Sequence, residues 1–158
     1  MKKGWFFLVV LYFSVLPLAG GAEDKTAVRK DRYPVCGMFV SQFARWNATI
    51  EFADATQATF DGTKCMFKYY LDIEKYNPLK STIKISAISV KDYYTQKAIP
   101  ARKAYFVIWS DVYGPMGHEP LPFEREAEAR KFLREHKGRK ILRFGDITQG
   151  LLQSLDNP

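Results

Sequence analysis

The chain has 158 residues, a formal net charge of +7 and 15% aromatic residues. This length suits a single domain, and the aromatic side chains can fill its core densely. The sequence has no phosphate-binding loop, no Gly-x-Ser-x-Gly element and no His-Glu-x-x-His element, which argues against the enzyme classes that use them.

The N-terminal segment has the pattern of an export signal. Lys2 and Lys3 precede an apolar stretch at residues 6–18, and residues 19–22 are small. The apolar stretch is too short to span a bilayer comfortably, so we expect cleavage rather than retention as an anchor. No cysteine follows the stretch, which excludes a bacterial lipid anchor at that point.

Three parts are therefore expected: a signal peptide at residues 1–22, a flexible charged leader at 23–32 and one domain at 33–158. The mature protein is expected in the periplasm, with no membrane span after cleavage of the signal. Nucleic acid is not an expected partner in that compartment. The positive charge suits acidic partners, lipid head groups or a simple solvated surface.

The order of elements along the domain predicts an α+β fold. Short apolar or alternating runs predict strands at residues 47–53, 57–60, 83–90, 104–109 and 140–144. Helical spacing of apolar residues predicts helices at residues 65–76, 124–136 and 147–155. The Gly- and Pro-rich residues 110–122 are expected to form a loop. In the strand at 83–90, the alternation places Ile83, Ile85, Ala87 and Ser89 on one face.

The two halves of the domain repeat one order of elements. The repeated features are a Phe-acid pair, a helix that contains a phenylalanine, and a strand. In the first half they are Phe60-Asp61, the helix with Phe67 and the strand at 83–90, and in the second half Phe123-Glu124, the helix with Phe132 and the strand at 140–144. This repetition predicts two related ββαβ units with mostly antiparallel sheet.

Every methionine after the first lies beside a cysteine or a histidine. Met38 closes Cys36-Gly37-Met38, Met66 follows Cys65, and Met116 opens Met116-Gly117-His118. Thiolate and thioether sulfur are soft ligands that prefer Cu(I) to zinc, magnesium or calcium. Residues two apart on an extended segment project to the same side, so Cys36 and Met38 can share one ion.

The loop at residues 110–122 offers a second group of ligands. Its Gly and Pro residues are expected to hold Met116 on an exposed turn, and His118 can add an imidazole ligand to the same ion. Packing of Met116 in the core is the alternative.

Cys65 and Met66 stand at the start of the predicted helix, where adjacent side chains point in different directions. Met66 is therefore expected in the core, and Cys65 is a reserve ligand only. A Cys36–Cys65 disulfide is the competing interpretation, because two cysteines in an exported chain often form a bridge.

Four stretches resemble the NosL family, the copper-binding accessory proteins of nitrous oxide reductase. They are residues 34–40 (PVCGMFV), 60–67 (FDGTKCMF), 110–119 (SDVYGPMGHE) and 121–123 (LPF). The resemblance implies an exported chaperone that binds one Cu(I) and passes it to the copper sites of the reductase. It also implies a fold of two related ββαβ units, similar to one found in organomercurial lyase. By position, it implies Cys36, Met38 and Met116 as Cu(I) ligands, with His118 as a further one.

The sequence thus favours a periplasmic Cu(I) metallochaperone, not an enzyme. Its expected partners are a copper donor and a receiving enzyme, either nitrous oxide reductase or another exported copper enzyme. One alternative is a disulfide-braced exported binding module without metal. Another is a thiol enzyme that acts on organometals, by analogy with the lyase fold.

Overall fold

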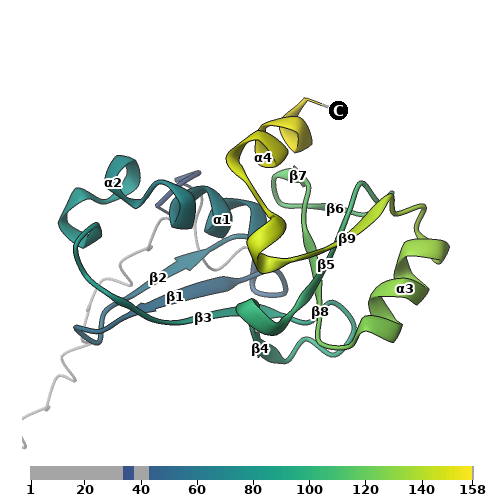
Figure 1. The fold of residues 1–158 in the computed structure, drawn as a ribbon, viewed down its shortest axis with the longest axis horizontal. Coiled ribbons are helices and arrows are strands. Elements are labelled where there is room, and N and C mark those ends of the chain that lie inside the picture. Colours follow the sequence, from purple (N-terminus) through teal and green to yellow (C-terminus); the bar gives the residue numbers. More distant parts are fainter. Residues whose placement is uncertain (1–33, 38–42, 158) are drawn as a thin grey trace, which may run out of the picture.

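The computed structural model describes residues 34–37 and 43–157, and their elements form an α+β fold with two main antiparallel sheets (Figure 1). The predicted signal peptide, the leader and Met38 lie outside the described residues. In the described part of the chain, none of the helices has the length and apolar character needed to cross a membrane.

The first unit is built on a four-stranded sheet with the strand order β2-β1-β3-β4. Its strands are β1 (Ala48–Phe52), β2 (Gln57–Phe60), β3 (Ile85–Lys91) and β4 (Ala98–Pro100). Between β2 and β3 the chain forms α1 (Thr63–Leu71), α2 (Ile73–Tyr76) and the 3-10 turn η2 (Pro78–Lys80). Ile50 and Phe52 of β1 are both buried, as the alternation of this strand predicts.

The second unit is built on a three-stranded sheet with the order β8-β5-β9. It follows the 3-10 turn η3 (Ala101–Lys103) and contains β5 (Tyr105–Ile108), β8 (Leu121–Phe123), α3 (Glu126–Glu135) and β9 (Lys140–Arg143). A small hairpin of β6 (Tyr113–Gly114) and β7 (Gly117–His118) is inserted between β5 and β8. The turn η4 (Phe144–Asp146) and the helix α4 (Gln149–Asp156) close the chain.

The predicted duplication is confirmed by the order of the strands. In each unit the second strand pairs with the first, and the first pairs with the strand that follows the helix, which is β3 in one unit and β9 in the other. Each helix begins three residues after the phenylalanine that ends the second strand, Phe60 or Phe123. The ring of Phe60 lies 5.1 Å from that of Tyr69, and the ring of Phe123 lies 5.0 Å from that of Phe132. The counterpart of Phe132 is therefore Tyr69, whereas the ring of Phe67 contacts that of Phe106.

Three details of the predicted elements are wrong. A register shift against β1 leaves one extra residue, Ser86, in β3, so the buried residues of its second half are Ile88 and Val90 instead of Ala87 and Ser89. The helix predicted at 65–76 breaks at Asp72, whose backbone leaves the helical region. The predicted loop at 110–122 contains the β6–β7 hairpin and the first two residues of β8.

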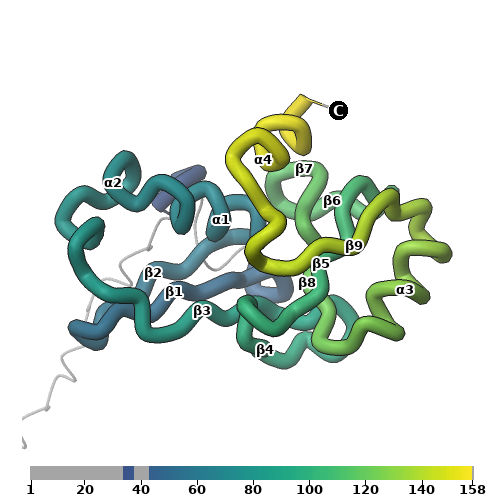
Figure 2. Tube along the Cα trace, in the orientation of Figure 1, coloured from purple at the N-terminus to yellow at the C-terminus, as the bar shows by residue number. Residues whose placement is uncertain are grey.

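The main hydrophobic core joins the two units. The ring of Phe67 on α1 contacts that of Phe106 on β5 at 5.3 Å, and Met66 is fully buried in the same core, as predicted. Helix α4 packs against both α1 and β7 near the junction of the units (Figures 1 and 2). The start of α1, the hairpin and α4 are thereby brought together.

Candidate metal centre

Three potential metal ligands meet where β2 leads into α1. They are the thiols of Cys36 and Cys65 and the carboxylate of Asp61, and one ligand atom from each lies within 4.8 Å of the other two. Asp61 directly follows β2, and Cys65 is in the first turn of α1, so the short strand–helix connection holds both. Cys36 reaches them from the segment that precedes β1, and both cysteines carry thiols rather than a disulfide.

The carboxylate of Asp61 is the most unusual member of this group. Its side chain is 0% exposed, and neither of its oxygens has a hydrogen-bond partner of good geometry among the described residues. A buried carboxylate without such partners is costly, and metal coordination is one way in which proteins compensate this cost. Asp61 therefore fits a site that receives a cation.

The two thiols differ in their access to solvent. Cys36 is half-buried, whereas Cys65 is 1% exposed. Burial raises the pKa of the Cys65 thiol strongly, and the adjacent carboxylate of Asp61 and the other nearby negative charges add to this effect. A metal ion must displace the proton of such a thiol before it can bind the sulfur. Cys36 is the more accessible of the two sulfurs.

The start of α1 is capped by a residue from the other unit. Gly62 has no side chain for this role, and Oε2 of Glu119 instead accepts a hydrogen bond of 2.7 Å from the backbone N–H of Lys64. Burial raises the pKa of Glu119 to about 7, although its hydrogen bonds at the helix start oppose this shift. A Cβ atom at Gly62 would lie 2.8 Å from Oε1 of Glu119, and one at Gly114 would lie 2.4 Å from its Cγ. The side chain of Glu119 therefore fits here because neither glycine has a Cβ atom.

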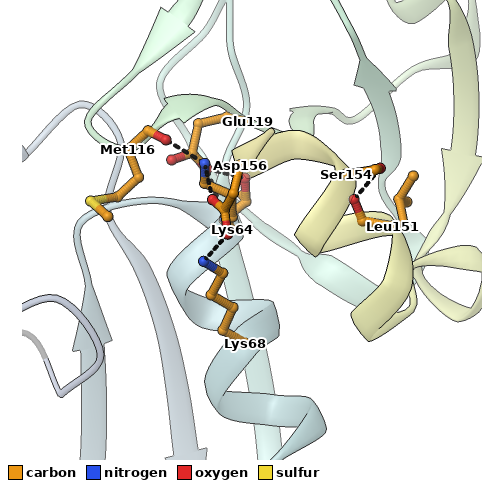
Figure 3. Close-up of polar contacts among 8 residues, drawn as sticks. Lys64, Lys68, Met116, Glu119, Leu151, Ser154 and Asp156 are labelled. Carbon is orange, nitrogen blue, oxygen red and sulfur yellow. Dashed lines mark hydrogen bonds and ion pairs between the residues drawn. The ribbon is translucent and has the colours of Figure 1, made fainter. Parts of the chain in front are cut away.

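The β6–β7 hairpin presents the other predicted ligands. Met116 is partly buried against the main core, so the expectation of an exposed turn is wrong for this side chain. Its carbonyl oxygen accepts a hydrogen bond from the ammonium of Lys64, which places the hairpin at the start of α1 (Figure 3). The structure thus brings Met116 to the helix turn that carries Cys65.

His118, on the same hairpin, contacts two aromatic rings. The centroid of its ring is 5.4 Å from that of Trp109 and 4.7 Å from that of Tyr113. Its Nδ1 atom is buried and has no hydrogen-bond partner among the described residues. A fixed ring with an unsatisfied nitrogen is suited to bind a ligand or an ion.

Three residues of this region were not identified from the sequence as part of a site. From the sequence, Asp61 was noted only in the repeated Phe-acid pair, and Lys64 and Glu119 only as members of the stretches 60–67 and 110–119. The spacing of Asp61 and Cys65 across a strand–helix junction was the one available signal, because such a short connection keeps both residues at the same end of the helix.

The fold and the site together identify the class of protein. It is a small α+β protein in which two thiols and a carboxylate at the start of a helix are able to hold a metal ion. The chain belongs to the NosL family, whose sequence profile matches residues 25–152. The family assignment, the α+β fold class and the expectation that the chain is not an enzyme are thereby confirmed.

The solved structures that are similar to this chain include two of NosL proteins. The crystal structure of the copper chaperone NosL from Shewanella denitrificans shares 26% sequence identity, with a TM-score of 0.63, over 76% of this chain and 91% of its own. The solution NMR structure of the apo-NosL protein from Achromobacter cycloclastes shares 25% identity, with a TM-score of 0.47, over 66% of this chain and 87% of its own. No curated protein sequence matches the chain significantly.

Proposed function

We propose that this protein is a Cu(I) metallochaperone. The main support for this proposal is that Cys36, Cys65 and Asp61 lie together at the start of α1. The hairpin with Met116 also contacts this end of the helix. Sulfur ligands of this kind favour Cu(I). The similarity to a structure described as a copper chaperone supports the same function.

The proposed ligands are Cys36, Met38 and Met116, with His118 as a further ligand. Thioethers and a neutral imidazole need not lose a proton when the metal binds, and they add no charge to the site. A half-buried Cys36 leaves one side of the ion open to an incoming ligand of a partner protein. Cys65, which lies deeper, is available as a second thiolate once its proton is displaced.

The protein would work outside the cytoplasm. Residues 1–22 would direct export and be cleaved, and the domain at 33–158 would act in the periplasm. There it would accept Cu(I) from a donor and deliver it to nitrous oxide reductase or to another exported copper enzyme. Its positive charge would favour encounters with acidic surfaces on such partners.

A Cu(I) titration against a competing chelator tests the proposed ligand set. Reduced protein is expected to bind one Cu(I), and Met116→Leu is expected to weaken binding about tenfold, because it removes one sulfur ligand but keeps the apolar volume. Met66→Leu is the matched control, since Met66 is fully buried in the core. Equal affinities for Met116→Leu and the unmodified protein would remove Met116 from the ligand set.

A disulfide-braced module without metal is the second candidate. The close approach of the two sulfurs, within 4.8 Å, favours it, because little movement would be needed to join them. It predicts that protein purified without reductant contains no reactive thiol, whereas the chaperone is expected to show two thiols after denaturation. Thiol titration in denaturant, with and without prior reduction, distinguishes the two candidates.

A further inference from the structure

Lys64 occupies a position that helix energetics and burial both disfavour. It is in the first turn of α1, where the positive end of the helix dipole repels a cation, and its side chain is 1% exposed. Burial of a lysine is also costly unless its charge and its hydrogen bonds are satisfied. A lysine is therefore expected here only if its ammonium group makes specific interactions that offset these two costs.

The ammonium of Lys64 has two partners, one on each side (Figure 3). It donates a hydrogen bond to the backbone carbonyl of Met116, and it lies 3.0 Å from Oδ1 of Asp156 at the end of α4. The side chain of Met116 extends away from this hydrogen bond in Figure 3. Lys64 thus holds the backbone of Met116 without occupying the space of its thioether.

Docking of α4 onto α1 does not explain Lys64. Lys68, one turn further along α1, already forms an ion pair of 2.6 Å with Oδ2 of Asp156 and is more exposed. The hydrogen bond to the Met116 carbonyl and the attraction to the buried carboxylate of Glu119 distinguish Lys64 from Lys68, and only the first joins Lys64 to a proposed copper ligand. Asp156 in turn fixes the ammonium of Lys64 from the opposite side.

We propose that Lys64 is a positioning residue for copper binding. Its hydrogen bond to the Met116 carbonyl holds the thioether of Met116 at the metal centre. This inference rests on the proposed Cu(I) function. Through Asp156, it also gives the C-terminal helix α4 a part in the geometry of the centre, although α4 contributes no proposed ligand.

A double-mutant cycle tests this inference. Cu(I) affinity is measured by chelator competition for Lys64→Met in the unmodified protein and in the Met116→Leu background. We expect Lys64→Met to weaken binding about tenfold in the unmodified protein and less than about twofold in the Met116→Leu background, because the thioether that it positions is then absent. Lys68→Met is the matched control, and it is expected to leave the affinity within about twofold.

The cycle separates positioning from a general structural role. Equal losses in both backgrounds, or no loss in either, would overturn the inference, since damage to the fold or to the local charge does not depend on the Met116 sulfur. If Lys64→Met fails to fold, Asp156→Asn takes its place and is expected to give a smaller loss with the same dependence on Met116. Failure of the unmodified protein to bind Cu(I) would overturn both the proposed function and this inference. Equal losses for Lys64→Met in the two backgrounds, or no loss in either, would overturn only the inference.

Discussion

Replacement of Cys36 by serine is expected to lower the affinity for Cu(I) more than about 100-fold. A hydroxyl group is a hard and weakly acidic ligand, whereas the thiolate is the single anionic sulfur in the proposed set. Loss of outer-shell partners of a metal site already costs 10–100-fold, and a direct ligand should cost more. Chelator competition on the reduced variant gives the measurement, and thermal unfolding checks that its fold is intact.

The variant Cys65→Ala tests whether the second thiol also binds the metal, and its affinity is compared with that of Cys36→Ser. If the metal is held by Cys36 and the methionines, the removal of the deeper thiol is expected to change the affinity by less than about tenfold. A loss as large as that of Cys36→Ser would instead place the ion between Cys36, Cys65 and Asp61, whose ligand atoms already lie within 4.8 Å of one another. Unchanged affinity in Cys36→Ser would contradict the proposed function.

Asp92→Ala is expected to destabilise the fold by about 3 kcal/mol. Asp92 is 0% exposed and follows β3, and its oxygens accept hydrogen bonds from the backbone N–H groups of Thr95 at 2.7 Å and of Glu124 at 2.8 Å. The second bond ties the end of β3 to the end of β8 and so connects the two units. Removal of the carboxylate takes charged hydrogen bonds from several partly buried backbone donors, which is costly.

Urea unfolding, followed by tryptophan fluorescence, measures this loss. Asp111→Ala is the control, because its exposed carboxylate only contacts His136 at 3.1 Å and should contribute less than about 1 kcal/mol. A loss below 1 kcal/mol in Asp92→Ala would contradict the role of Asp92 in connecting the two units.

The pH dependence of stability provides a second readout for Asp92. Burial favours the neutral acid, but the hydrogen bonds from Thr95 and Glu124 outweigh it and lower the pKa of Asp92 in the folded state. The stabilisation by the ionised group is therefore fully present above the unfolded pKa of about 3.9 and is lost as the pH falls through the lower folded pKa. The stability gap between Asp92→Ala and the unmodified protein is expected to shrink below about pH 4.

Local patterns were sufficient to predict most of the fold. The strand at 57–60 and the duplicated order of elements follow from alternation and helical spacing, which depend on near neighbours in the chain. The bulge at Ser86 was missed because it depends on pairing with β1 across the sheet. The equivalence of Tyr69 and Phe132 was missed because it depends on packing against Phe60 and Phe123.

The candidate centre was predicted only in part. The sulfur-containing motifs pointed to Cys36 and Met116 because their residue types carry the chemistry. Asp61 is recognised as unusual only once its burial is known. The contacts of Lys64 with Met116 and Asp156 join segments that are far apart in the chain, and no local pattern predicts them.

X-ray absorption at the copper edge of the Cu(I)-loaded, reduced protein tests the central claim most directly. Three sulfur neighbours are predicted, with one of them lost in Cys36→Ser and a different one lost in Met116→Leu. A first shell that contains only nitrogen and oxygen, or a sulfur count that neither substitution changes, would contradict the assignment of these residues as the copper ligands.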